Sequence, residues 1–224
     1  MDYITELFCI LDDFCKKFNE SLEKALISDQ KTTMKKSALS LSEVMTIVIL
    51  FHKSGFRFFK YFYCHMIIPF WKSAFPKLLS YNRFIEIMPR CLQALSSFFH
   101  QVKGEDTGIC IIDSTKLVVC HNLRIKRHRV FKGLAGRGKS STGWFYGFKV
   151  HIVINNLGEI INLKITSGSV HDVAVLESLT QELKGILLGD KGYLSKAKTE
   201  ALAARGLRLL TVSYTHLRAH ETEA

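Results

Sequence analysis

Two aspartates each follow a short apolar run in the second half of the chain, and their placement could support metal chemistry. Asp113 follows residues 109–112, and Asp190 follows residues 185–189. A lone carboxylate is rare at a buried strand end because an unpaired buried charge is costly. If the two runs form neighbouring strands, we expect the carboxylates to converge and to bind Mg²⁺, which prefers oxygen ligands. Two such ions can activate a water or hydroxyl against a phosphodiester. One aspartate alone would more often cap a turn, but the pair favours a metal site.

A strongly basic segment lies between the two aspartates. Residues 114–158 contain no Asp or Glu, and they carry nine Lys and Arg in a chain whose net charge is +11. Phosphate contacts dominate the affinity of basic segments for nucleic acid, whereas a merely solvated loop usually mixes both signs of charge. We therefore predict a flexible loop that binds nucleic acid through Arg124, Lys126, Arg127, Arg129, Lys132, Arg137 and Lys139.

The same loop contains a match to a nucleotide-binding pattern. Residues 133–140, GLAGRGKS, fit G-x-x-x-x-G-K-[ST]. That motif holds phosphate only when a strand enters the loop and a helix leaves it. Here a basic run without strand character enters, and residues 142–147 lead into a strand. Nucleotide binding is therefore a remote alternative.

The pattern of apolar residues indicates which elements position these groups. Strand-like segments occur at residues 109–120, 148–154, 161–165, 185–189 and 207–212. Helical segments occur at residues 172–183 and 195–205. The order β-β-β-α-β-α-β indicates a mixed α/β sheet. We expect Asp172 to be the N-cap of its helix rather than half of a His171–Asp172 dyad, because adjacent residues rarely face each other.

Residues 1–103 are predicted to form a helical domain. Ser40 and Glu43 have the spacing of a capping box at a helix start, Gly55 ends that helix, and residues 81–99 suggest one long helix. Short helices with basic and aromatic residues could form a helix-turn-helix that docks on DNA. A helical bundle that only packs or dimerises is an equally good interpretation.

Several classes of protein are excluded as first interpretations. The six cysteines form no CxxC pair, so a zinc site is not indicated and the thiols are expected to be reduced. The longest uncharged apolar run, residues 44–51, is too short to cross a bilayer. The N-terminus has no basic region followed by an apolar one, so secretion is not indicated.

Ordered blocks of residues spread over 1–212 resemble the DDE transposases of bacterial insertion sequences. In the second half the blocks are Asp113-Ser114-Thr115, CHNLRIKRH at 120–128, VFKGLA at 130–135, GWFYGFK at 143–149 and GDKGY at 189–193. In the first half they are LSEVMT at 41–46 and SYNRF at 80–84. Lys191 and Tyr193 in the last block could contact DNA or shape the turn.

The resemblance implies a ribonuclease-H-like catalytic domain, residues 104–212, behind the helical domain 1–103. Asp113 and Asp190 match the first and second catalytic aspartates of the family, with Mg²⁺ or Mn²⁺ as a two-ion cofactor. The implied reaction is metal-dependent cleavage at the terminal inverted repeats of an element, followed by strand transfer to target DNA. The implied partners are double-stranded DNA and a second copy of the chain, in the bacterial cytoplasm at the nucleoid and away from any membrane.

One feature of the family has no match here. The third acid of the family is a Glu on a helix beyond the second Asp, and the residues after Asp190 offer none in a matching context. We expect an incomplete ribonuclease-H-like sheet with flanking helices, and a polar tail at residues 213–224 that is foreign. Such a chain should bind DNA and cleave it poorly. The alternatives are a DNA-binding protein without catalysis and a related ribonuclease-H-fold nuclease.

Overall fold

The computed structural model describes residues 3–26 and 38–211, which fall into two units. The helical unit is Met1–Val102 and the sheet unit is Lys103–Ala224, and each is considered by itself. The tail predicted to be foreign, residues 213–224, lies outside the described residues. None of the described helices has the length and apolarity needed to span a bilayer.

The helical unit combines one long helix with shorter helices around a core rich in aromatic side chains. Its elements are α1 (Tyr3–Leu26), α2 (Leu41–Lys53), α3 (Phe59–Phe62), a π turn (Tyr63–Ile67), α4 (Ile68–Phe70), α5 (Tyr81–Ile87), a 3₁₀ turn (Met88–Cys91) and α6 (Leu92–Val102). The capping box is confirmed: the Glu43 amide donates to Ser40 Oγ at 3.1 Å, and the Ser40 amide donates to Glu43 Oε2 at 2.6 Å. The single helix expected over residues 81–99 is wrong. Pro89 lies in the 3₁₀ turn between α5 and α6, where it cannot donate a backbone hydrogen bond.

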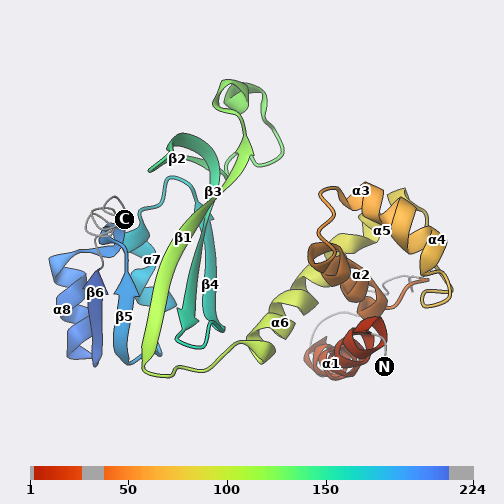
Figure 1. The fold of residues 1–224 in the computed structure, drawn as a ribbon, viewed down its shortest axis with the longest axis horizontal. Coiled ribbons are helices and arrows are strands. Elements are labelled where there is room, and N and C mark those ends of the chain that lie inside the picture. Colours follow the sequence, from red (N-terminus) through yellow and green to blue (C-terminus); the bar gives the residue numbers. More distant parts are fainter. Residues whose placement is uncertain (1–2, 27–37, 212–224) are drawn as a thin grey trace, which may run out of the picture. The chain divides into compact units, whose positions relative to one another are not determined.

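The sheet unit contains a six-stranded mixed sheet (Figure 1). Its strands are β1 (Ile109–Cys120), β2 (Gly136–Ser140), β3 (Gly143–Asn155), β4 (Ile160–Ser167), β5 (Gly185–Gly189) and β6 (Leu207–Thr211). The helices are α7 (Asp172–Leu179), between β4 and β5, and α8 (Lys196–Ala204), between β5 and β6. The path is β2-β3-β1-β5-β6 with β4 also on β3; β1, β3 and β4 pair antiparallel, while β1, β5 and β6 are parallel. This order confirms the expected ribonuclease-H-like fold.

One strand of the sheet was not expected. The segment predicted to be an unstructured loop contains β2, which pairs with the first residues of β3. Its glycines allow close backbone contact, since a Cβ on Gly138 would lie 2.2 Å from the carbonyl oxygen of Gly168. The residues that match the nucleotide-binding pattern therefore end in a strand, and they form no phosphate loop before a helix.

The two faces of β1 differ in burial. Cys110 and Ile112 are buried in a core shared with α7, α8, β5 and β6. Ile109 and Ile111 alternate with them and are 41% and 39% exposed. By the same alternation, Asp113 belongs to the open face of the sheet.

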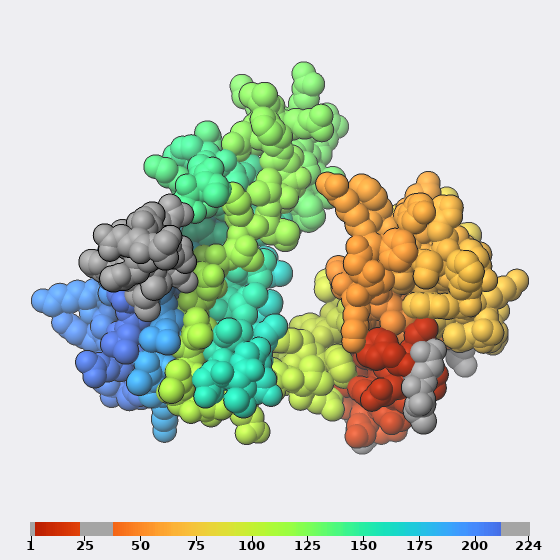
Figure 2. Space-filling model, in the orientation of Figure 1, coloured from red at the N-terminus to blue at the C-terminus, as the bar shows by residue number. Residues whose placement is uncertain are grey.

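The chain between β1 and β2 forms a projection that we name the basic arm, residues 121–135. It begins with the 3₁₀ helix η3 (Asn122–Arg127). In Figure 2 the arm, coloured green, stands out from the rest of the sheet unit.

Candidate active site

The structure brings Asp113 and Asp190 to one pocket. Ile112 pairs with Gly189 in the parallel β1–β5 ladder, so each aspartate is the next residue after a paired position. Both line a pocket of about 430 Å³. β1 and β5 are therefore neighbouring strands, as the predicted metal site requires.

Both carboxylates keep oxygen atoms available to a ligand. Asp113 Oδ1 accepts a hydrogen bond from the Ser114 amide at 2.7 Å, and Asp190 Oδ1 accepts one from the Lys191 amide at 2.6 Å. Both side chains are exposed, and neither forms an ion pair among residues 3–26 and 38–211. Two carboxylates fit a hard divalent cation, because Mg²⁺ is commonly held by one or two carboxylates while water and substrate phosphate complete its shell. Within the described residues no group of three His, Cys, Asp or Glu is placed to hold a metal.

A third aspartate in the pocket was missed by the sequence argument. Asp172 was expected to cap α7, but the N-cap position is His171. The Asp172 carboxylate faces the sheet instead: its Oδ1 lies 3.0 Å from Lys149 Nζ, 3.3 Å from Ser114 Oγ and 3.8 Å from His151 Nδ1. The sequence did contain a signal for this role of Asp172. Lys149 and His151 alternate along β3, so both side chains point to the covered face of the sheet, where polar groups need a partner.

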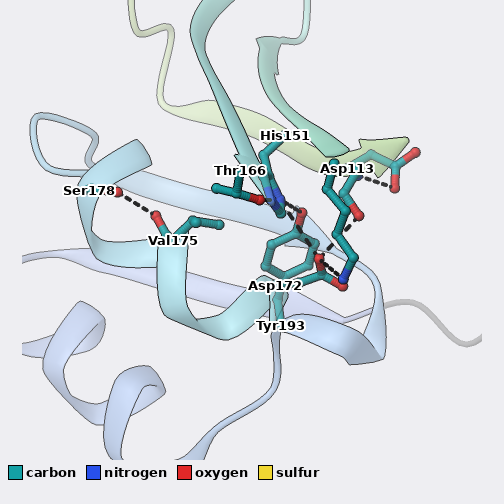
Figure 3. Close-up of polar contacts among 9 residues, drawn as sticks. Asp113, His151, Thr166, Asp172, Val175, Ser178 and Tyr193 are labelled. Carbon is teal, nitrogen blue, oxygen red and sulfur yellow. Dashed lines mark hydrogen bonds and ion pairs between the residues drawn. The ribbon is translucent and has the colours of Figure 1, made fainter. Parts of the chain in front are cut away.

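Two buried side chains, His151 and Tyr193, lie behind Asp172 (Figure 3). His151 is 0% exposed, with Nδ1 3.4 Å from Tyr193 Oη and Nε2 2.9 Å from Thr166 Oγ1. Burial lowers the pKa of His151, although Asp172 acts in the opposite direction. Burial also raises the pKa of Tyr193, and Asp172 adds to that rise. Tyr193 is 1% exposed, so it shapes the turn after Asp190 and is not available to DNA.

Three lysines line the same pocket as the three aspartates. Lys116 and Lys149 are direct cross-strand partners on β1 and β3. Lys149 is ion-paired with Asp172, whereas Lys116 contacts the hydroxyls of Ser140 and Thr142. The pocket therefore combines acids suited to a cation with amines suited to phosphate.

The seven predicted DNA contacts are all exposed, and they lie on two elements. Five belong to the basic arm: Arg124, Lys126, Arg127, Arg129 and Lys132. The other two are on β2, where Arg137 lies over the Trp144 ring at 5.0 Å and Lys139 lines the pocket. Their role in binding DNA stays a prediction.

Comparison with known families gives one match. The family described as "Transposase DDE domain" matches residues 103–223, a range that includes the segment for which the sequence predicts a foreign origin. No curated protein sequence matches the chain.

Solved transposase structures resemble the chain weakly. A piggyBac transposase synaptic complex with hairpin DNA is 10% identical with a TM-score of 0.44, covering 88% of this chain and 47% of that one. The Mos1 strand transfer complex is 12% identical with a TM-score of 0.31, covering 93% and 72%. The Mos1 mariner paired-end complex with Mn is 11% identical with a TM-score of 0.30, covering 94% and 73%. The chain thus spans about half the length of the piggyBac chain that it matches.

Proposed function

The chain belongs to the DDE transposase family, and from that premise we propose that Asp113 and Asp190 are its catalytic pair in the cleavage and transfer of DNA strands. The observation that carries the proposal is their position on neighbouring parallel strands, β1 and β5, at one pocket. Their free oxygens and the lysines beside them suit a site that must hold both a cation and a phosphodiester.

Transposases of this family use divalent metals, and we propose Mg²⁺ or Mn²⁺ held as a two-ion site by Asp113 and Asp190. The metal would lower the pKa of an attacking water or 3′-hydroxyl and stabilise the leaving oxygen. The protein supplies the carboxylates from β1 and β5, and Lys116 and Lys139 at the pocket can bind the phosphates on either side of the reacting one.

The proposed substrates are the terminal inverted repeats of an insertion sequence and a target duplex. The basic arm and β2 would bind the phosphate backbone through the seven basic residues named above. We propose a helical domain at residues 1–103, a catalytic domain at residues 104–212 and a foreign tail at residues 213–224. The helical domain could add a DNA-binding surface. We propose a homodimer that acts at the bacterial nucleoid in the cytoplasm, since two element ends must be processed together.

A second candidate function is DNA binding with little or no cleavage. The observation that favours it is that the described residues include no group of three His, Cys, Asp or Glu placed to hold a metal, and the third aspartate of the pocket, Asp172, is paired with Lys149. Two carboxylates leave a second ion with few protein ligands, so we propose that this chain cleaves DNA poorly. A ribonuclease-H-fold nuclease would share the metal site, and it would form no joined strand-transfer product.

The test combines metal binding with plasmid nicking. Mn²⁺ binding by the full chain would be measured by electron paramagnetic resonance, and nicking of supercoiled plasmid would be followed with Mg²⁺ or Mn²⁺. We expect Asp113→Asn and Asp190→Asn to weaken Mn²⁺ binding and abolish any nicking. DNA affinity should stay the same or rise, because a negative charge near phosphate is lost.

The control is Glu177→Gln, which removes an acid of α7 that pairs with Lys198. It should bind Mn²⁺ and DNA like the unmodified chain. Mn²⁺ binding and nicking that are the same in Asp113→Asn and in the unmodified chain would refute the metal assignment. Metal binding that depends on Asp113 without any nicking would favour the second candidate.

A further inference from the structure

The contacts of Asp172 give it a function of its own. We propose that Asp172 is a positioning residue for the acid pair: it holds the residue after Asp113 and the turn after Asp190 from the covered face of the sheet. This inference rests on the proposed function, because it assumes that the two acids bind a divalent cation. Asp172 is not proposed as a metal ligand.

The link to Asp113 runs through the next residue of β1. Ser114 Oγ donates to Asp172 Oδ1 at 3.3 Å, and the Ser114 amide donates to Asp113 Oδ1 at 2.7 Å. Ser114 therefore joins the two carboxylates, one through its side chain and one through its backbone. Fixing Ser114 fixes the direction in which the Asp113 carboxylate points.

The link to Asp190 runs through the 3₁₀ turn η4 (Lys191–Tyr193), for which Asp190 is the N-cap. A Cβ on Gly192 would lie 3.2 Å from Asp172 Oδ2, so the turn passes directly against this carboxylate. Tyr193 Oη lies 3.4 Å from His151 Nδ1, which in turn lies 3.8 Å from Asp172 Oδ1. The turn after Asp190 and Ser114, the residue after Asp113 in β1, thus lie against the same side chain.

The environment of Asp172 makes this link rigid. The Asp172 and Lys149 side chains are 22% and 14% exposed, and they pair at 3.0 Å. Because water has limited access, the charged bond restrains Asp172 more strongly than a surface pair would. His151 is buried behind them and closes the network from β3. Residues that orient metal ligands from behind commonly change metal affinity by roughly 10–100-fold when they are mutated.

The test compares three alanine variants of the full chain by Mn²⁺ titration with electron paramagnetic resonance, after circular dichroism confirms folding. Asp172→Ala removes the contacts of this carboxylate with Ser114, Lys149 and His151, and Ser114→Ala removes only the uncharged link to Asp113. Glu177→Ala is the control, because it removes another α7 carboxylate that pairs with Lys198 rather than with the pocket. We expect Asp172→Ala to weaken Mn²⁺ binding by about tenfold or more, Ser114→Ala to weaken it severalfold and Glu177→Ala to leave it unchanged.

If Asp172→Ala does not fold, Lys149→Met combined with Asp172→Ala replaces it, because Lys149 would otherwise be left half-buried without its ion-pair partner; the expected loss is the same. Unchanged Mn²⁺ affinity in the Asp172 variant overturns the proposal. So does a loss restricted to Asp172→Ala with Ser114→Ala unaffected, since this would mean that charge alone is responsible. An equal loss in Glu177→Ala also overturns it. Failure of the proposed function would give a different result from failure of the role of Asp172. In that case Asp113→Asn would bind Mn²⁺ as the unmodified chain does.

Discussion

Asp106 joins the starting ends of the two strands that carry the acid pair. Its Oδ2 accepts a hydrogen bond from the Lys184 amide at 2.9 Å, just before β5. Its Oδ1 accepts one from the Gly108 amide at 2.9 Å, just before β1. Replacing Asp106 by Ala removes both acceptors, so we expect the sheet unit to lose stability.

The expected loss follows from these two bonds. A hydrogen bond to a charged group contributes about 1.5–3 kcal/mol. Asp106 is exposed, so water replaces much of each bond and each is expected to contribute less than that range, about 1 kcal/mol. We expect Asp106→Ala to reduce the free energy of unfolding of the sheet unit by about 2 kcal/mol in total. Each 1.4 kcal/mol changes the unfolding equilibrium constant about tenfold, so the fraction of molecules with an unfolded sheet unit should rise by roughly 30-fold.

Amide hydrogen exchange measures this loss at defined positions. The Lys184 amide should lose its protection in Asp106→Ala, and amides in the core of β5 such as Leu187 should exchange about 30-fold faster. Glu105→Ala is the matched control, because its side chain accepts no hydrogen bond among the described residues. Equal exchange in Asp106→Ala and the unmodified chain would refute the reasoning.

The pH dependence provides a second check on Asp106. Burial alone raises the pKa of Asp106, but the hydrogen bonds from the Lys184 and Gly108 amides outweigh it, so the pKa is lowered. A carboxylate with a lowered folded pKa stabilises the protein above its unfolded pKa of about 3.9, and this contribution is lost as the pH falls through the folded value. The stability difference between the unmodified chain and Asp106→Ala should therefore be full at pH 7 and shrink below about pH 4. A difference that stays constant to pH 3 would contradict this account.

Two further outcomes are expected. Replacing Lys126, Arg127 and Arg129 together by Gln should reduce the slope of log affinity for DNA against log salt concentration by about one per residue that contacts phosphate; an unchanged slope in filter binding would exclude the arm from the interface. Leu187→Ala should cost about 2–5 kcal/mol in urea unfolding because Leu187 is 0% exposed. Leu210→Ala, at a site 37% exposed, should cost less, and equal losses would argue against the core assignment.

The order of elements and the acid pair could be predicted because their signals are local. Alternating apolar residues identify most of the strands, and an acid directly after each of two short apolar runs marks the candidate site. The Ser40–Glu43 capping box depends on residues three apart in one turn, so it was predictable as well.

Other predictions failed. The β2 segment has the composition of a loop, although it pairs with β3, the next strand in the sequence. Its backbone also lies close to a distant segment, since a Cβ on Gly138 would meet Gly168, 30 residues away in the sequence. The single helix expected over residues 81–99 was wrong for a different reason. The apolar spacing predicted a continuous helix, although Pro89 in the sequence already indicated a break there.

Asp172 shows most clearly what only the tertiary structure decides. In the sequence it stands at a helix start, where an aspartate commonly caps. In the structure its partners are Ser114 and Lys149, 58 and 23 residues away, and they meet it because α7 packs on the covered face of the sheet. The sequence by itself determined five of the six strands of the described sheet and the two acids that follow the apolar runs 109–112 and 185–189, because alternation and turn residues act over a few positions. Which side chains support those acids was decided by the packing of α7 and η4 against β1 and β3, which no local pattern encodes.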